Sequence, residues 1–325
     1  MFKSTDKVLI TGSSGFVGRN LLNNLHKNHP CKLVALIHEN YPAHEYADVK
    51  YTLADLTDPK DCKRVVREVD YIFHCAANTS GAAVMQDSPL EHVTANILMN
   101  LHLFEAAYNA GVKKILWISS GAIYPLSDHP MKEDEAFTGE PYEKYFAVAH
   151  MKRYTETLAE LFSSRLQRKL PIIVIRPSNI YGPYDKFDLV KGHVTASLIK
   201  KVINKMDPLE IWGTGEEIRD LIYIDDFIAG LLLAFEKLDN YNPVNIGSGI
   251  GYSVVQILST LLLLEDFHPE LIYNKNKPTT IPKVLLDVTK AKQLLGFKAS
   301  TSLEVGLKRT IEWYRRTYGN LKNAV

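Results

Sequence analysis

Three glycines near the amino terminus have the spacing of a phosphate-binding turn. In "VLITGSSGFVGRNLL", Gly12, Gly15 and Gly18 follow a β-branched run directly and lead into a helical pattern. Glycines there allow a tight turn, a close approach of backbone to pyrophosphate, and close packing of helix on strand. The helix N-terminus, with Phe16 and Val17, offers amide donors and a positive dipole to the anion. Glycines also serve ordinary turns, but the strand-turn-helix context favours a dinucleotide site.

The second apolar run ends at "LVALIHENY", where such a site needs a group that reads the adenosine ribose. A carboxylate there binds the 2′-hydroxyl of NAD, whereas an arginine accommodates the 2′-phosphate of NADP. His38 occupies the approximate position and Glu39 follows it, so NAD and NADP both stay open. Asp55 in "LADLTD" suits a contact with the adenine amino group, although an Asp at a strand end is as often a helix cap.

The elements that must position these residues alternate between apolar runs and helical patterns through the first half of the chain. Continuous Val, Ile and Leu strands separated by helices are typical of a parallel sheet covered on both faces. We therefore predict an α/β fold with a Rossmann-type doubly wound parallel sheet. The expected strands are "KVLITG", "KLVALI", "VKYTLAD", "VDYIFHCAA", "KKILWISS" and "PIIVIRPS", with a helix from Gly15 to about Lys27 after the first.

The alternation loosens beyond about residue 183 into polar stretches that contain Pro and Gly. Helices are expected near 194–205 and 253–264, without a regular strand-helix-strand rhythm. We expect a dinucleotide-binding domain over 1–183 and a smaller α+β, mainly substrate-binding, region over 184–325. The chain is expected to cross back into the first domain, so one boundary is approximate.

Composition narrows the class of partner. The chain has 38 basic and 37 acidic side chains, a net charge of +1, so no overall field favours nucleic acid or a membrane surface. No apolar run approaches the roughly 20 residues that span a bilayer. The three cysteines have no paired or metal-like spacing, which indicates a reducing compartment and no metal site. We expect a cytoplasmic protein with a small-molecule partner.

Several further motifs occur in a fixed order after the glycine turn. They are "HCAA" at 74–77, Asn96 in "TANILMNLHLFEAA", "ISSGAIYP", "RPSNIYGP" and "IRDLIYIDD". With the turn, they make the whole chain resemble the extended short-chain dehydrogenase/reductases that act on nucleotide sugars, and most of all the GDP-fucose synthases. The resemblance implies that Leu56, Ala76, Ala77 and Asn96 also contact the cofactor.

Enzymes of that family use a Ser or Thr, a Tyr and a Lys at the C4 oxygen of the sugar. The resemblance implies Ser120 as the serine and Lys152, with Glu156 four residues on, as the lysine that also holds the cofactor ribose. Val148 stands where the tyrosine belongs. Tyr145, one turn earlier and displaced by roughly 4.5 Å along the helix axis, is one candidate replacement. A residue from another segment, or no replacement, are the alternatives.

The fucose synthases also carry a histidine and a cysteine that invert C3 and C5. The resemblance gives His193 in "KGHVTASLIKK" as the histidine, but Ala122 stands in the cysteine's place. Inversion needs a base on one face and an acid on the other, so the double epimerisation is in doubt. Gly121 and Ala122 also replace the Asp-Glu pair of the 4,6-dehydratases, which argues against dehydration.

The substrate nucleotide is expected farther along the chain. The resemblance implies Lys201 at the diphosphate, and Trp212 with Arg219 at base and phosphate. Arg and Lys suit diphosphate oxygens because both are cations at neutral pH; the alternative is a solvated lysine face and a core tryptophan. Asn179, at a strand's carboxyl end, is expected to contact the sugar nucleotide or shape the loop below it.

Two functions from different classes follow. The first is an NAD(P)-dependent epimerase or reductase of an NDP-hexose, with a GDP-4-keto-6-deoxy sugar favoured. The second is a catalytically silent subunit that binds cofactor or nucleotide sugar. The resemblance also implies a homodimer through helices near 94–109 and 146–164. Apolar candidates for that surface are Leu98, Leu101, Phe104, Leu158 and Leu161, which could equally pack on the sheet.

Overall fold

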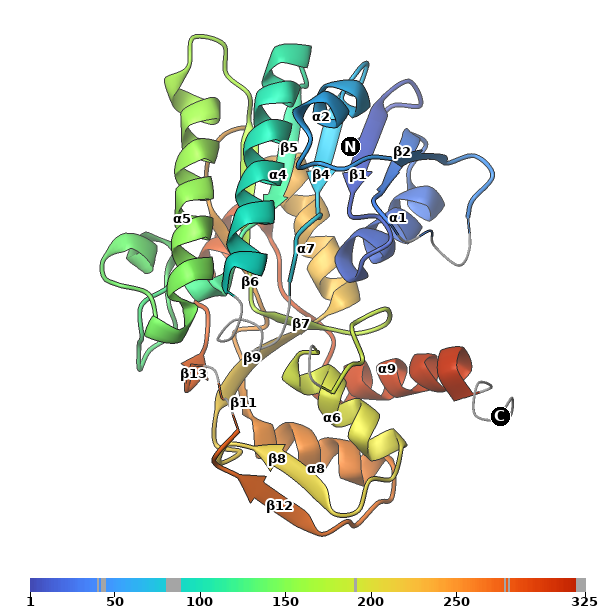
Figure 1. The fold of residues 1–325 in the computed structure, drawn as a ribbon, viewed down its shortest axis with the longest axis vertical. Helices are drawn as coiled ribbons and strands as arrows, with labels where there is room; N and C mark the ends of the chain where they lie inside the picture. The colour runs from blue at the N-terminus through green and yellow to red at the C-terminus, as the bar shows by residue number, and fades with distance from the viewer. Residues whose placement is uncertain are drawn as a thin grey trace.

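The computed structural model describes residues 1–39, 41, 45–79, 89–189, 192–277, 279 and 281–319. A large lobe built on one sheet stands above a smaller lobe of short strands and helices (Figure 1). The sheet is wholly parallel and has seven strands in the order β10-β6-β5-β4-β1-β2-β3. Its strands are β1 (Lys7–Thr11), β2 (Lys32–Ile37), β3 (Lys50–Leu53), β4 (Tyr71–His74), β5 (Lys114–Ile118), β6 (Ile172–Pro177) and β10 (Val244–Ile246).

The strand order reverses between β1 and β4, so the chain winds outward in both directions from β1, as predicted for a doubly wound fold. Successive side chains on a strand point to opposite faces of the sheet. Leu9 and Ile10 on β1 accordingly belong to two different apolar clusters. Helices must therefore cover both faces, and the expected fold class is confirmed.

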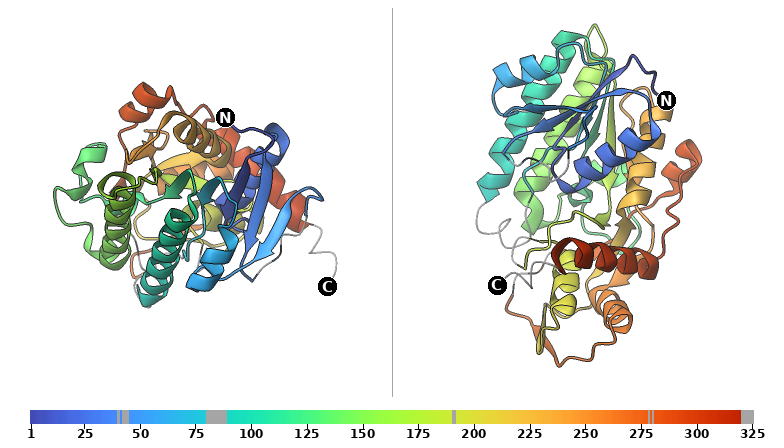
Figure 2. Two further views of the ribbon diagram at one scale, coloured as in Figure 1. Left: turned by 90° about the horizontal axis from the view of Figure 1, so that it is seen from above. Right: turned by 90° about the vertical axis from the view of Figure 1, so that its right-hand side faces the viewer.

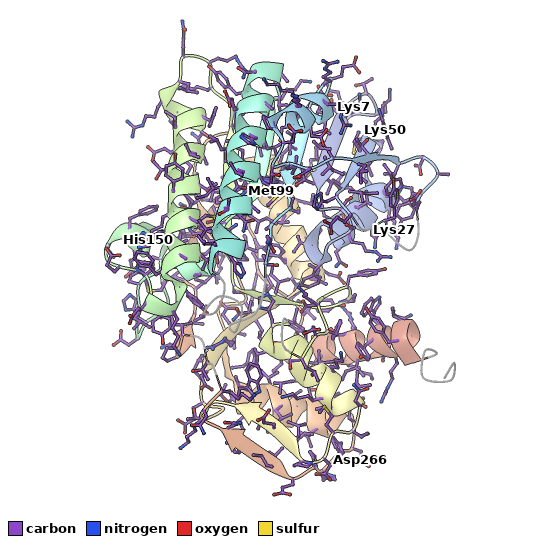
Figure 3. The ribbon with its side chains drawn as sticks, viewed as in Figure 1. Lys7, Lys27, Lys50, Met99, His150 and Asp266 are labelled. Atoms are coloured by element: carbon purple, nitrogen blue, oxygen red, sulfur yellow. The ribbon has the colours of Figure 1, made fainter. Side chains whose placement is uncertain are left out.

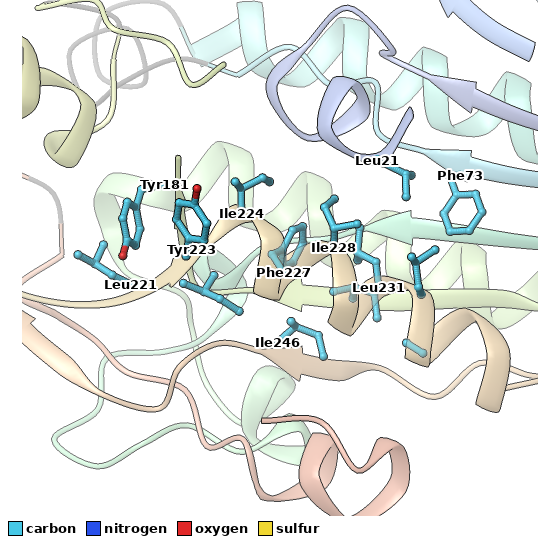
Figure 4. Packing of buried hydrophobic residues seen from close by; sticks show 14 of the residues in the cluster. Leu21, Phe73, Tyr181, Leu221, Tyr223, Ile224, Phe227, Ile228, Leu231 and Ile246 are labelled. Carbon is cyan, nitrogen blue, oxygen red and sulfur yellow. The ribbon is translucent and has the colours of Figure 1, made fainter. Parts of the chain in front are cut away.

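One face packs against α1 (Phe16–Asn28) and α7 (Ile224–Lys237), and the other against α2 (Pro59–Val65), α4 (Pro89–Ala110) and α5 (Phe146–Glu160). The two layers of helices are seen on either side of the sheet in Figure 2. On the first face, Phe227, Ile228 and Leu231 of α7 pack in one cluster with Leu21 of α1 and with Phe73 and Ile246 of the sheet (Figure 4). Burying an aliphatic side chain of this size contributes roughly 1.5–3 kcal/mol.

The described part of the smaller lobe contains a four-stranded sheet, a strand pair and three α-helices. The sheet holds β7 (Asn179–Tyr181), β9 (Ile218–Tyr223), β11 (Gly251–Ser253) and β13 (Lys283–Val284), and β8 (Leu209–Trp212) pairs with β12 (Leu271–Asn274). The helices are α6 (Val194–Ile203), α8 (Val254–Leu264) and α9 (Leu303–Tyr318). Short 3₁₀ turns lie at Gly121–Ile123, Glu133–Phe137 and Glu143–Tyr145, and π-helical turns at Leu161–Arg165 and Ala291–Leu295.

The chain passes between the lobes more than once. After β9 it returns through α7 and β10 to the large sheet, and then leaves again at Gly251. One continuous apolar cluster joins the sheet, α7 and the small-lobe helices, through residues such as Ile175, Phe227 and Leu258. The division at residue 183 stays a prediction, and α7 with β10 belongs structurally with the first lobe.

Three expectations from composition can be compared with the described part of the chain. Cys31, Cys62 and Cys75 are free thiols. Within the described ranges, no cluster of three His, Cys, Asp or Glu side chains is placed to hold a metal ion. No described helix combines the length and apolar content needed to cross a bilayer.

Candidate functional site

The glycine turn lies where β1 ends beside β4. Gly12 has φ +64°, and a Cβ atom there would lie 2.8 Å from the Cα atom of Ala76. At Gly18, the first buried position of α1, a Cβ atom would lie 2.2 Å from the Gly12 carbonyl oxygen. Only glycine fits at either place, because one requires a left-handed backbone and both meet backbone atoms. The turn is thus built for close approach of main chain to main chain.

The N-terminus of α1 is open to an anion. Gly15 is the N-cap, and in the described structure no side chain caps the first turn and no acidic residue lies in it. The amides of Phe16 and Val17 therefore have no intrahelical acceptor, and the dipole is not offset by a carboxylate. These features fit the pyrophosphate of a dinucleotide, whose charge would complete the helix end.

The ribose end of this site holds one imidazole between two carboxylates. The Nδ1 and Nε2 atoms of His38 lie 4.0 Å from carboxylate oxygens of Glu39 and Asp55 respectively. Asp55 Oδ1 accepts hydrogen bonds from the hydroxyl and amide of Thr57, which lower the pKa of this carboxyl group. Asp58 caps α2 instead, so the alternative cap role of Asp55 is wrong. Leu56 beside it is buried.

A buried hydrogen-bond chain positions Ala76 after β4. The Ala76 amide donates to Thr11 Oγ1 at 3.0 Å, Thr11 Oγ1 lies 2.7 Å from His74 Nδ1, and His74 Nε2 lies 2.9 Å from Asn100 Oδ1. Burial lowers the pKa of His74 to about 3, so the ring is neutral at pH 7. His74 is therefore part of the buried support that fixes Ala76.

Asn96 shapes the loop that follows Ala77. Its Oδ1 atom accepts from the Asn78 amide, and its Nδ2 atom donates to the carbonyls of Asn78 and His92. Both amide hydrogens are thereby used inside the protein. Asn96 holds the wall of the predicted cofactor site in place; its predicted contact with the cofactor would have to use the oxygen or follow a rearrangement.

Ser120 and Lys152 meet at the carboxyl end of β5. The buried Lys152 ammonium donates to the Ile118 carbonyl oxygen at 2.9 Å, and Ser120 follows two residues later as the cap of the 3₁₀ turn, accepting from the Ala122 amide at 3.0 Å. Burial lowers the pKa of Lys152 to about 8, and the Glu156 carboxylate opposes that lowering. The tertiary structure therefore brings the predicted serine and lysine to one edge of the sheet.

Tyr145 lies at the amino end of α5, seven residues before Lys152. It is the N-cap of α5, and its ring lies edge-on to Tyr142 with centroids 5.9 Å apart. Burial lowers the pKa of the Arg219 guanidinium, and negative charge on Tyr145 opposes that lowering. The tyrosine is thus within electrostatic range of Arg219, while half-buried Val148 occupies the first turn of α5, one turn before Lys152.

A buried ionic network beneath Ser120 was missed by the sequence reasoning. Glu156 accepts from Ser119 Oγ at 2.6 Å and from Arg176 Nη2 and Nε at 2.6 and 3.0 Å. Arg176 also donates to the Tyr124 hydroxyl, which donates to Asn245 on β10. The one signal in sequence was Glu156 four residues after Lys152, on the same face of the helix.

His193 is exposed at the N-cap of α6. The neighbouring Asp185 is buried, burial raises the pKa of its carboxyl group, and positive charge on His193 opposes that rise. Asp185 Oδ1 accepts from the Lys186 amide. The histidine and this carboxyl group are therefore close enough to interact.

The predicted nucleotide residues gather at Glu210 and β9. Buried Lys201 donates to the Glu210 carbonyl oxygen at 2.6 Å, and Trp212 Nε1 donates to the Glu210 carboxylate at 3.1 Å. Burial lowers the pKa of Lys201. Arg219 is buried on β9 and donates to the Ile218 and Pro282 carbonyls. The solvated-face alternative is wrong for Lys201, because its ammonium is held against the protein.

Asn179 starts β7 beyond the carboxyl end of β6. Its Nδ2 atom is buried and makes no hydrogen bond with the rest of the described chain. A buried amide donor without an acceptor is costly, and a ligand acceptor would satisfy it.

Asp226, in the first turn of α7, bonds to a segment outside its own helix. Tyr223 is the N-cap of α7, and no side chain caps this helix in the described structure. The Asp226 carboxylate accepts from the Ser300 amide and hydroxyl and from the Thr301 amide. It therefore ties the segment before α9 to α7.

The fold and the glycine turn define a dinucleotide-binding α/β protein with a second lobe over the carboxyl edge of its sheet. The sequence profile described as the NAD dependent epimerase/dehydratase family matches residues 8–247. This is more than half of the chain, and the chain belongs to that family. The protein is therefore an enzyme that uses NAD or NADP as its cofactor, as predicted.

Curated relatives align over nearly the whole chain. A GDP-L-fucose synthase of Sinorhizobium fredii is 27% identical over 94% of both chains. The GDP-L-fucose synthase of Escherichia coli is 26% identical over 96% of this chain and 97% of its own. A GDP-mannose 3,5-epimerase of Oryza sativa is 28% identical over 95% of this chain and 82% of its own.

Solved structures agree with the fold. A UDP-glucose 4-epimerase of Thermotoga maritima, solved with UDP-glucose, has a TM-score of 0.84 and 29% identity over 96% of this chain and 99% of its own. A UDP-glucuronic acid 4-epimerase of Bacillus cereus, solved with UDP-glucuronic acid and NAD, has a TM-score of 0.85 and 25% identity over 96% of this chain and its full length.

Proposed function

We propose that this chain is an NAD(P)-dependent epimerase or reductase of a nucleotide sugar, with a GDP-4-keto-6-deoxy hexose as the favoured substrate. The observation that carries the proposal is the meeting of Ser120 and buried Lys152 at the sheet edge that also holds the glycine turn. The GDP preference rests on the curated relatives, since several of them are named for GDP-sugar reactions.

The substrate would lie between the two lobes, over the carboxyl ends of the strands. Asn179 would give its unpartnered amide hydrogens to the sugar nucleotide. Arg219 would face the phosphate as a buried cation, with Trp212 beside the base. Lys201 would act at the diphosphate only if its ammonium leaves the Glu210 carbonyl, because that bond now holds it.

When bound at the glycine turn, the dinucleotide would supply the hydride chemistry at C4 of the sugar. The protein's part is to hold the C4 oxygen and to move a proton at it. Ser120 Oγ would donate to that oxygen, and we propose Tyr145 as the residue that exchanges its proton. A tyrosine that gives up a proton becomes negative, and Arg219 is the buried cation within range to stabilise that charge.

Epimerisation would use His193. With Ala122 in the place of the cysteine, one face of the sugar lacks an acid, so His193 would exchange a proton at one centre instead of inverting two. Its exposure at the N-cap of α6 leaves the ring open to a substrate.

A second candidate is a silent subunit that binds cofactor or nucleotide sugar without turnover. Val148 favours it, because the position one turn before Lys152 has no ionisable group. Loss of a positioned proton donor costs about 10² to 10⁴ in rate, and that loss leaves binding intact.

The test is proton NMR in D₂O with a panel of NDP-4-keto-6-deoxy sugars, with and without reduced cofactor. We expect loss of the keto form that depends on cofactor, or deuterium at C3 or C5. Tyr145→Phe should lower reduction by about 10² to 10⁴, whereas Tyr142→Phe, the adjacent ring, should change it little.

Equal rates for these two variants would remove Tyr145 from the mechanism. No turnover by the wild-type chain across the panel, with cofactor binding confirmed, would support the silent subunit.

We also propose that two copies associate through α4 and α5, which pack side by side, and that the protein works in the cytoplasm, where its three free thiols would stay reduced.

A further inference from the structure

We propose that the open edge of β12, in the small lobe, is a self-association surface through which two copies of this chain pair antiparallel across a two-fold axis. This surface is separate from the proposed α4–α5 surface. Figure 1 shows β12 at the far end of the small lobe, away from α4 and α5. The pairing does not depend on which reaction the enzyme catalyses.

One long edge of β12 has no partner strand within the described ranges. There β12 pairs with β8 alone, in parallel register. The Leu209 amide of β8 donates to the Glu270 carbonyl at 2.8 Å, which fixes the residues of β12 that face β8. Since parallel pairing uses alternate residues of a strand, the amides and carbonyls of Leu271 and Tyr273 point toward the open edge.

The strand lacks the features that usually protect a sheet edge from pairing. Leu271, Ile272 and Tyr273 are 36%, 43% and 41% exposed. Natural edge strands avoid association with charged residues or proline on the edge, and the "LIYN" of β12 contains neither. The edge therefore offers a partner strand both unpaired backbone groups and apolar side chains.

The charges at the two ends of β12 favour a second copy in antiparallel orientation. Glu270 directly precedes the strand and Lys275 directly follows it, and both side chains are exposed. An antiparallel copy brings the acidic end of each strand to the basic end of the other, whereas a parallel copy would bring like charges together. The arrangement also satisfies two-fold symmetry, because each copy presents the same surface to the other.

One register pairs the two outward-facing residues with each other. Leu271 faces Tyr273 of the second copy, and the two residues exchange N–H···O bonds through their outward amides and carbonyls. Ile272 then lies on the two-fold axis opposite Ile272 of the second copy, where Cβ atoms approach to about 4.5–5.5 Å. In this register Glu270 lies within one position of Lys275 of the second copy.

The contact is short, so the pairing should be weak. The strand has four residues, and two such strands bury less than the roughly 1,200 Å² of a stable interface. We expect a dissociation constant of about 10 to 100 µM. The surface is then unpaired near 1 µM or so, where association through α5 is measured separately.

The experiment is sedimentation velocity of the full chain at low ionic strength, over a series from about 1 to 300 µM. The mass at the high end should approach twice the mass at the low end, whether the smaller species is a monomer or a dimer through α5. Ile272→Lys should weaken the pairing by roughly tenfold or more, because two lysines then oppose each other on the axis. Val305→Lys, at a 42% exposed residue of α9 in the same lobe, is the matched control and should leave the series unchanged.

Exchange of the end charges tests the antiparallel orientation without changing the apolar surface. Glu270→Lys alone should weaken the pairing, because it brings a like charge to Lys275, and adding Lys275→Glu should restore it. Three outcomes overturn the proposal: a mass that stays constant across the series, Ile272→Lys and Val305→Lys variants that associate equally, or a double exchange that pairs as weakly as the single one.

Discussion

At the scale of single residues, Lys152 is the member of the proposed site whose chemistry burial changes most clearly. Lys152 lies 8% exposed with one carbonyl acceptor and an indole ring 4.7 Å away. A lysine so placed destabilises the fold while it is charged, because its ammonium leaves water. The lowering of its pKa from 10.5 to about 8 corresponds to a cost of roughly 3 kcal/mol for keeping the ammonium charged in the folded protein.

Lys152→Met should therefore abolish turnover without lowering stability. Between about pH 8 and 10.5 the unfolded chain keeps the Lys152 proton that the folded chain has released, so wild-type stability rises with pH in this window. The variant lacks this titration, and its free energy of unfolding should equal or exceed that of wild type at pH 7. Urea denaturation at pH 7 and 9.5 measures both quantities.

Lys169→Met makes the same lysine-to-methionine substitution at an exposed position and serves as the control. A variant at Lys152 that unfolds more easily than wild type at pH 7, while Lys169→Met does not, would show that the lysine is structural.

At the scale of elements, the proposed site depends on the contacts that hold the turn after β1, and α5, against their neighbours. The turn after β1 fits only because Gly12 has no side chain, since its neighbour Ala76 is fixed by the chain from Thr11 to His74. α5 places Val148, Lys152 and Glu156 four residues apart on one face, so the ionic network fixes the lysine's helix against β5. Removing Glu156 alone would leave the buried Arg176 guanidinium without its counter-ion, which costs about 3–5 kcal/mol.

Gly12→Ala should weaken dinucleotide binding on the order of tenfold or more, because the new Cβ atom forces β1 and Ala76 apart. Gly111→Ala is the matched control: Gly111 has φ +79°, but no atom lies within 4 Å of an added Cβ. Both substitutions carry backbone strain of about 1–2 kcal/mol. Fluorescence titration with NADH and thermal denaturation separate the two effects. Equal loss of binding in both variants would mean that strain alone, not the close contact, explains the result.

At the scale of the whole molecule, α5 and the turn after it expose three large apolar side chains that could serve assembly. Phe146 is 63% exposed, Tyr154 51% and Leu161 39%. Phe104 and Leu158, two of the residues expected at the dimer surface, are buried in the core and cannot serve it. Figure 3 labels His150, which lies on α5 between Phe146 and Tyr154.

Phe146→Glu/Tyr154→Glu should convert a dimer into monomers, because each carboxylate would be buried without a partner at the interface. Sedimentation velocity at micromolar concentration measures the mass. Leu263→Glu, on an exposed leucine of α8 in the small lobe, should leave the mass unchanged. A wild-type protein that sediments as a monomer would refute the proposed dimer directly.

The sequence by itself determined the local features. Glycine spacing, apolar runs and helical periods depend on neighbours within a few residues, so the phosphate turn, the parallel strands of the large sheet and the helices near 194 and 254 could be predicted. The order of its motifs was enough to indicate the family.

Tertiary structure decided which distant residues meet. Glu156 and Arg176 are 20 positions apart, Tyr145 and Arg219 are 74 apart, and β10 pairs with β6 across 69 positions. No local pattern encodes such pairs. Burial likewise depends on the whole fold, which is why Lys201 proved to be held against a carbonyl and Asp226 tied to the segment before α9. Packing across the sheet, and not propensity along the chain, sets those contacts.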